Sequence, residues 1–172
     1  RTAVAEMKNR IRNSLPIGIA TSINIATLDR TAFSFGIGCG SKFEELMGSF
    51  DDNIEQAIQQ LENNNPLLFE YLSHLKHIII DEAQDITGSR AKLVSLILSS
   101  LNESTGVTVF ADALQAIYGF TNDFGSIENS DNSLSGIFNF EKNGYQCVSL
   151  KEIHRTKDKK LLMSSNGQCK AH

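Results

Sequence analysis

The stretch His77–Asp85, with the sequence HIIIDEAQD, joins a short apolar run to two adjacent acids. Its three consecutive isoleucines favour an extended strand that is buried in a sheet. Asp81 and Glu82 would then stand at the C-terminal end of the strand, the edge where open α/β sheets bind ligands. Adjacent carboxylates there are typical of a metal–nucleotide site, where one acid serves a magnesium ion and the other a water molecule. For the acid pair taken alone, a strand that ends in a polar turn is an equally good interpretation.

The residues that follow predict that this strand belongs to a βαβ unit. Apolar residues recur at the spacing of a helix packed on a sheet, namely at Val94, Ile97, Leu98 and Leu101. A second buried strand is predicted over Val107–Ala111, and it ends at Asp112. Strand, helix and strand in this order, with an acid at each strand end, indicate a parallel sheet in an α/β protein.

Helix and strand patterns also appear on both sides of this unit. Upstream, they predict an amphipathic helix over residues 2–13, a short strand over Ile23–Ala26, a helix or loop over Thr27–Phe35, and helices around Ile54–Leu61 and from Asn65 and Pro66 onward. Downstream, residues 121–136 are predicted to be a loop and Tyr145–Leu150 one more strand.

Three alternating glycines, Gly36, Gly38 and Gly40, look at first like a phosphate-binding loop. No strand leads directly into them, and no Gly-Lys-Ser/Thr follows them. A flexible connector is therefore the favoured interpretation of this segment.

The composition is that of an ordinary globular protein, with 41% hydrophobic and 21% charged residues in a chain of 172. The net charge of −4 is weak evidence against a nucleic-acid partner, because a groove can carry its basic residues locally. Three scattered cysteines form neither a disulfide framework nor a zinc spacing, which favours a reducing, cytoplasmic setting. No apolar run approaches the ~20 residues that span a bilayer. Because the chain begins with Arg1 inside a helical pattern, we expect it to be a piece of a longer protein.

Five segments occur in an order that matches a known family. They are residues 2–11, Thr27–Asp29, Asp81–Asp85, Val109–Phe120 (VFADALQAIYGF) and Leu150–Thr156 (LKEIHRT). Together they resemble motifs Ia, Ib, II, III and IV of the UvrD/Rep-like superfamily I DNA helicases, and the resemblance covers residues 1–165. The acid pair becomes the Walker-B element of a P-loop NTPase. The fold class expected is thus α/β, a partial RecA-like domain with a parallel sheet flanked by helices.

The resemblance implies roles for five residues in ATP hydrolysis. Asp81 would hold Mg²⁺, and Glu82 would contact the metal and take the proton of the attacking water. Gln84 and Gln115 would bind the nucleotide, and Gln115 would sense its γ-phosphate. Arg155 would act as an arginine finger, since its planar fork suits phosphate oxygens. The cofactors implied are ATP and Mg²⁺.

Four further residues are implied to contact single-stranded DNA. Thr27 and Asp29 would touch the DNA backbone or line its channel. Tyr118 and Phe120 would stack on unpaired bases, although alternate aromatic residues are as often part of a core. Three departures from the family pattern stand nearby, namely Ala113 in place of a proline, His154 in place of a tyrosine, and Arg30–Thr31 in place of Ser-Phe. The Arg30–Thr31 departure lies beside Thr27 and Asp29, the residues that the resemblance implies for the DNA contact.

The chain contains no Gly-x-x-x-x-Gly-Lys-Ser/Thr, and nothing in it resembles motifs V and VI. We therefore expect residues 1–125 to form the first RecA-like core domain without its P-loop, with a reduced helical insertion around 41–75. Residues 126–172 would form a connector and the start of the second core domain. The isolated polypeptide is expected to be inactive, because ATP binds between two complete core domains in this family.

The resemblance implies an ATP-dependent DNA helicase or translocase that moves 3′ to 5′, with the remaining helicase domains of the parent chain as partners and no membrane. One alternative is the helicase part of a helicase–nuclease subunit. Two others are a non-catalytic interaction module and a nucleotide-binding protein without a DNA role. The non-catalytic alternative is disfavoured by four residues that occur together, Asp81, Glu82, Gln115 and Arg155. They make up the part of the nucleotide site that does not come from the P-loop.

Overall fold

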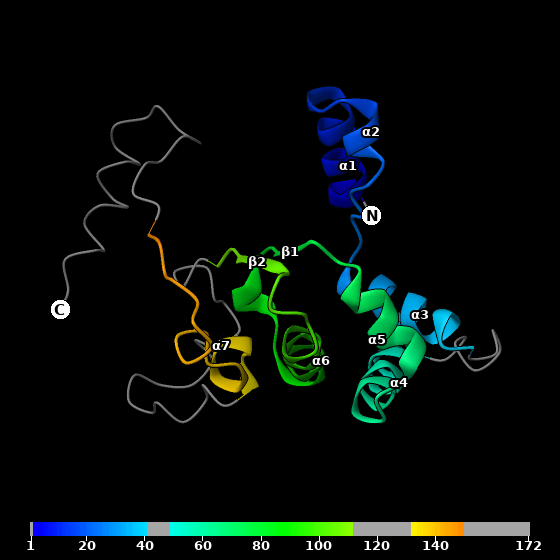
Figure 1. Ribbon diagram of the computed structural model, residues 1–172, viewed down its shortest axis with the longest axis vertical. Coiled ribbons are helices and arrows are strands. Elements are labelled where there is room, and N and C mark those ends of the chain that lie inside the picture. Colours follow the sequence, from blue (N-terminus) through cyan, green and yellow to red (C-terminus); the bar gives the residue numbers. More distant parts are fainter. Residues whose placement is uncertain (1, 41–48, 112–131, 150–172) are drawn as a thin grey trace. The chain divides into compact units, whose positions relative to one another are not determined.

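The computed structural model describes residues 2–40, 49–111 and 132–149 (Figure 1). The chain divides into two compact units, Arg1–Asn139 and Phe140–His172. The predicted domain boundary after residue 125 falls outside the described residues. In the described parts of the chain, no helix is both long and apolar enough to cross a bilayer.

The described residues of the first unit include a two-stranded parallel sheet. Strand β1 (His77–Ile80) pairs with β2 (Gly106–Val109), with His77 opposite Gly106 and Ile80 opposite Val109. Helix α6 (Gly88–Ser99) makes the crossover between the two strands. The predicted βαβ unit and the α/β fold class are therefore confirmed.

The two faces of β1 differ in burial. Ile78 packs against a core cluster that includes Leu93 and Ile97 of α6, whereas the side chain of Ile79 is 67% exposed. Successive side chains of a strand point to opposite faces, so α6 covers one face only. The expectation of a buried strand is thus wrong for the face that carries Ile79, because no described element covers it.

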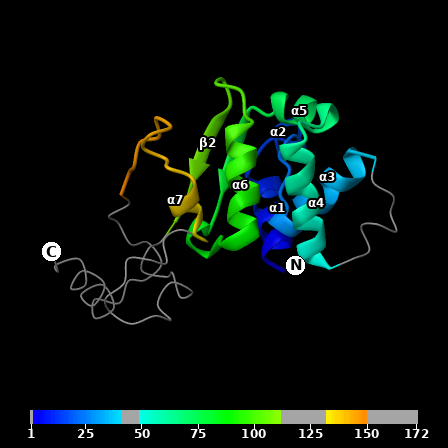
Figure 2. The same cartoon turned by 90° about the horizontal axis from the view of Figure 1, so that it is seen from below.

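In the core, α4 (Phe50–Glu62) packs between α3 (Leu28–Gly38) and α6 (Figure 2). A short helix, α7 (Leu134–Ile137), also packs against α6, so the loop predicted over residues 121–136 is wrong at its C-terminal end. Helix α5 (Pro66–Ser73) contacts both α3 and α4. Ile54, Ile58 and Leu93 are almost completely buried. Burial of each such side chain stabilises the fold by roughly 1.5–3 kcal/mol. The apolar periodicity of the sequence therefore identified the interior faces of α4 and α6 correctly.

Local sequence signals explain where α4 and α5 begin. Ser49 and Asp52 form a capping box, in which the Ser49 N–H donates to Asp52 Oδ2 at 2.8 Å and the Asp52 N–H donates to Ser49 Oγ at 3.2 Å. These bonds lower the pKa of Asp52, the Ser49 N–H having the largest effect. Asn65 accepts from the N–H of Leu67 at 3.0 Å, with Pro66 as the first helical residue. The predicted cap at Asn65 is confirmed.

The N-terminal part of the first unit is a pair of helices, α1 (Thr2–Ser14) and the single turn α2 (Ile17–Ala20), which confirms the helix predicted over 2–13. The strand predicted over Ile23–Ala26 is wrong, because the segment is irregular and pairs with no described strand. The connector predicted at the alternating glycines is also wrong in part. Gly36 and Gly38 belong to α3, and only Gly40, with φ +83°, adopts the turn conformation that glycine favours.

The described part of the second unit is a turn. Phe140 accepts backbone hydrogen bonds from Asn143 and Tyr145, and Gly144 between them has φ +81°. The rings of Phe140 and Tyr145 meet edge to face at 5.4 Å, and burial raises the pKa of Tyr145. The strand predicted from Tyr145 is wrong over 145–149, because this turn takes its first residue and no described strand pairs with the rest.

A small residue is required where β2 begins. A Cβ added to Gly106 would lie 2.3 Å from Nδ1 of His77, whose Nε2 is 2.9 Å from Thr108 Oγ1. We predict that Gly106→Ala lowers the free energy of unfolding by about 1 kcal/mol, because the new methyl group displaces the imidazole from its hydrogen bond. The measurement is urea denaturation.

The control is the same substitution in a His77→Ala background. There we expect Gly106→Ala to be neutral or to stabilise the fold by about 0.4–1 kcal/mol, since it restricts the unfolded chain without a clash. Equal destabilisation in both backgrounds would show that the imidazole is not the cause.

Candidate nucleotide edge of the sheet

The acid pair lies at the C-terminal end of the parallel strands. Strand β1 ends at Ile80, whose carbonyl accepts from the N–H of Phe110 at 2.8 Å. The N–H of Ala83 then donates to the carbonyl of Phe110 at 2.9 Å. The chain is thus tied to the end of β2 on both sides of Asp81 and Glu82. Both acidic side chains are exposed at this edge, as the sequence predicted.

Glu82 has an unusual backbone conformation. Its φ of 52° and ψ of 43° place it in the left-handed region, and it precedes the 3₁₀ turn η2 (Ala83–Asp85). A residue with a Cβ pays about 1–2 kcal/mol for this conformation. The N–H of Glu82 donates to Asp81 Oδ1 at 3.0 Å, and the carbonyl of Glu82 accepts from Asp85 N–H at 3.0 Å. Strain of this kind is concentrated at functional sites, where the surrounding structure enforces it.

Gln84 contacts the carboxylate of Glu82 directly. Its Nε2 donates to Glu82 Oε2 at 2.6 Å across the turn of η2. The side chain of Gln84 is partly buried, whereas that of Glu82 is exposed. A partly fixed amide therefore restrains an otherwise free carboxylate. Sequence reasoning assigned Gln84 to the nucleotide and missed this contact, which the spacing of two residues alone does not reveal.

The chemistry of the acid pair fits a magnesium ion. Mg²⁺ prefers oxygen ligands and is usually held by one or two carboxylates, with waters and substrate phosphates completing its shell. Asp81 and Glu82 supply two adjacent exposed carboxylates. Within the described ranges, no group of three or more His, Cys, Asp or Glu residues forms a cage for a metal. Two carboxylates are the number with which a protein commonly holds an Mg²⁺ ion whose other ligands are waters and substrate phosphates.

Of the other predicted site residues, some lie outside the described part of the chain and two lie at the start of α3. Gln115, Tyr118, Phe120 and Arg155 lie outside the described residues. Thr27 is the N-cap of α3, and its Oγ1 accepts from the N–H of Arg30 at 3.3 Å. Asp29 follows in the first turn of α3 and is partly buried.

Asp29 is paired with an arginine that the sequence analysis did not single out. Arg90, in the first turn of α6, donates to Asp29 Oδ1 from Nη2 at 2.8 Å and from Nε at 3.2 Å. Its Nη1 lies 3.0 Å from Oδ1 of Asp51, in the first turn of α4. Sequence separations of 61 and 39 residues explain why no local pattern points to this cluster.

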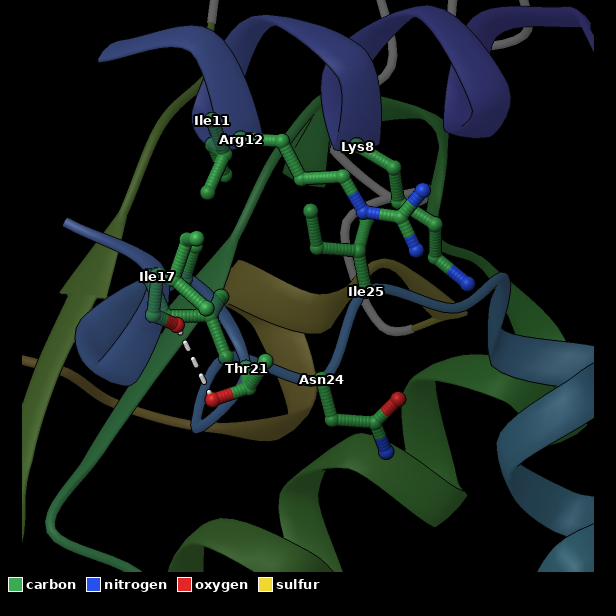
Figure 3. Close-up of a pocket in the computed structure, with 9 residues that line it drawn as sticks. Lys8, Ile11, Arg12, Ile17, Thr21, Asn24 and Ile25 are labelled. Carbon is green, nitrogen blue, oxygen red and sulfur yellow. Dashed lines mark hydrogen bonds between the residues drawn. The ribbon is translucent and has the colours of Figure 1, made fainter. Parts of the chain in front are cut away.

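A second feature lies between α1 and the segment that follows it. A hollow of about 400 Å³ is lined on the α1 side by Lys8, Ile11 and Arg12 and opposite them by residues of α2 and the stretch 21–25 (Figure 3). The side chains of Lys8 and Arg12 run along one wall above Ile25. Thr21 fixes its own segment by donating to the carbonyl of Ile17 at 3.0 Å. The hollow is mixed in character, with two basic groups beside apolar ones.

The strain at Glu82 predicts an order of stabilities. Glu82→Gly should have a free energy of unfolding about 1 kcal/mol higher than Glu82→Ala, because glycine enters the left-handed region without steric cost. At Asp85 of the same turn, which has no positive φ, the order should reverse. Chemical denaturation of the four variants measures both differences. If Glu82→Gly is no more stable than Glu82→Ala, the left-handed conformation at this position is refuted.

One comparison with known proteins gives a match. The model of the UvrD/REP helicase N-terminal domain matches residues 41–133, which is more than half of the chain. The matched range contains the acid pair, Gln115, Tyr118 and Phe120, but neither Thr27–Asp29 nor Arg155. No curated protein and no solved structure matches the chain. On the strength of the match over 41–133, the chain belongs to the UvrD/REP helicase family.

Proposed function

We propose that the chain is part of an ATP-dependent DNA helicase or translocase, which moves 3′ to 5′ on single-stranded DNA. One observation carries this proposal. Two adjacent acids stand at the C-terminal edge of a parallel βαβ unit, inside the range that matches the helicase domain. That edge is where α/β folds of this kind bind nucleotides.

The geometry suggests how the acid pair would act. Asp81 would hold an Mg²⁺ ion that arrives with ATP, and such an ion would supply neutralising charge to the phosphate oxygens. Glu82 accepts the proton of the attacking water. Gln84, which already donates to Oε2 of Glu82 at 2.6 Å, keeps that carboxylate oriented. A restrained base needs less reorganisation at the moment of reaction.

The remaining roles follow from the resemblance. By that resemblance, Gln115 would contact the γ-phosphate, and Arg155 would reach the same phosphate from the second core domain. Tyr118 and Phe120 stack on bases, an interaction worth about 1–3 kcal/mol per base. Thr27 and Asp29 line the DNA path at the start of α3.

We also propose how the chain is divided between the two RecA-like domains of the full-length protein. Residues 1–125 belong to the first RecA-like domain and residues 126–172 lead into the second. ATP binds between the two domains, so that its hydrolysis moves one against the other. The other helicase domains of the full-length protein are therefore required partners.

The test is the steady-state ATPase activity of the full-length protein with and without single-stranded DNA. We expect DNA to stimulate ATP hydrolysis, and Glu82→Gln to lower kcat by about 100-fold or more with ATP binding retained, because the amide cannot accept the proton of the water. Glu103→Gln is the matched control, since Glu103 is exposed and precedes the opposite end of β2. Its kcat should not change.

Two results would contradict the proposal. One is a full-length protein whose ATPase activity does not respond to single-stranded DNA. The other is a Glu82→Gln variant with the kcat of the Glu103→Gln control. The isolated 172-residue chain is expected to hydrolyse no ATP, and activity in it that disappears with Glu82→Gln would refute the requirement for a second domain.

A further inference from the structure

Three helices of the core begin at one place, and Arg90 joins them. Its guanidinium contacts Asp29 in the first turn of α3 at 2.8 Å and Asp51 in the first turn of α4 at 3.0 Å. Arg90 itself belongs to the first turn of α6. Beside it, Ser89 Oγ donates to Glu55 Oε1 at 2.5 Å, which fixes the start of α6 to α4 a second time.

The charges of Asp29 and Asp51 compensate the unfavourable position of Arg90 at a helix N-terminus. An arginine at a helix N-terminus opposes the helix dipole, whereas aspartates at N-termini are favoured by it. Burial lowers the pKa of Arg90, but the hydrogen bonds and charges of Asp29 and Asp51 more than offset this and raise it. The two aspartates thus compensate an arginine that the dipole of α6 alone would disfavour.

The Arg90 cluster connects the two regions that carry the proposed function. Helix α6 begins six residues after Glu82, through the short turn η2 that Glu82 itself opens. On the other side, Asp29 follows Thr27 at the start of α3, the segment proposed to line the DNA path. The direct Arg90–Asp29 ion pair is therefore a short physical link between them.

Exposure and geometry separate the two ion pairs. The side chains of Arg90 and Asp29 are 39% and 34% exposed, whereas Asp51 is 78% exposed. Asp29 accepts two N–H groups of the guanidinium, and Asp51 lies near one. Exposed ion pairs contribute little to stability. An arginine that donates two N–H groups to one carboxylate holds a fixed geometry, which a lysine does not reproduce. The Asp29 pair is thus the one that can transmit a displacement.

We propose that Arg90 is a positioning residue that couples DNA binding at the start of α3 to the orientation of the acid pair. This inference rests on the proposed function. When DNA shifts the first turn of α3, the Arg90–Asp29 pair carries the shift to the first turn of α6, and η2 carries it to Glu82. Coupling of this kind is reciprocal, so ATP must change DNA affinity by the same link.

The experiment uses the full-length protein and two readouts. The first is the ratio of ATPase rates with and without single-stranded DNA. The second is the Kd for a fluorescent oligonucleotide, with and without a non-hydrolysable ATP analogue. We expect a change in Kd of about fivefold or more in the wild type, the usual size of a coupling. In Arg90→Lys and Asp29→Asn, both the stimulation and the change in Kd should fall to within twofold of none.

Asp51→Asn is the matched control, because it removes the other carboxylate of Arg90 but leaves the pair with Asp29. It should keep the stimulation and the change in Kd of the wild type. The double variant Arg90→Lys/Asp29→Asn should lose no more than either single variant, since both remove the same link. Thermal melting of each variant confirms that it is folded.

The outcomes distinguish failure of the coupling role of Arg90 from failure of the proposed helicase function. If the wild type is stimulated and Arg90→Lys is stimulated equally, the coupling role of Arg90 is wrong and the proposed function stands. If Asp51→Asn loses stimulation as fully as Asp29→Asn, the cluster is a structural brace and the inference is also wrong. A wild type without stimulation by DNA refutes both.

Discussion

The parallel pairing of β1 with β2 is the constraint on which the rest of the structure depends. Parallel strands require a crossover, and here α6 provides it while burying Leu93 and Ile97 against the helical core. Because both strands run the same way, their C-terminal ends meet at one edge. The hydrogen bonds of Phe110 with Ile80 and Ala83 then fix the chain on either side of the acid pair. This non-local pairing places a local feature of the sequence, two acids after three isoleucines, at the C-terminal edge of the sheet.

The same arrangement brings the N-terminus of α6 close after the candidate site and links it to two other helix N-termini. Helix α6 starts soon after Glu82, and Arg90 holds the starts of α3 and α4 beside it. The nucleotide edge and the start of α3 are thus parts of one connected framework. Strain at Glu82 is compatible with this view, since a left-handed glutamate persists only where its neighbours are held in place.

The predictions from sequence succeeded where the signal was local and periodic. The cap at Asn65, the apolar faces of α4 and α6, and the βαβ order all come from short-range patterns. The predictions failed where contacts with other segments of the chain decide the local conformation. Ile23–Ala26 has strand propensity but no described strand beside it, and Tyr145 is held in a turn by Phe140 and Gly144. At the candidate site, a local motif predicts Asp81 and Glu82, whereas the partners of Arg90 lie far along the chain, where no local pattern reveals them.

The most direct test of the acid pair is metal binding in the presence of nucleotide. The full-length protein is mixed with Mn²⁺ in place of Mg²⁺ and a non-hydrolysable ATP analogue, and bound Mn²⁺ is measured by electron paramagnetic resonance. We predict that Mn²⁺ binds only with nucleotide, and that Asp81→Asn weakens its binding by about tenfold or more while Glu103→Gln does not. Equal Mn²⁺ binding by wild type and Asp81→Asn would contradict the assignment of the acid pair as the metal–nucleotide site.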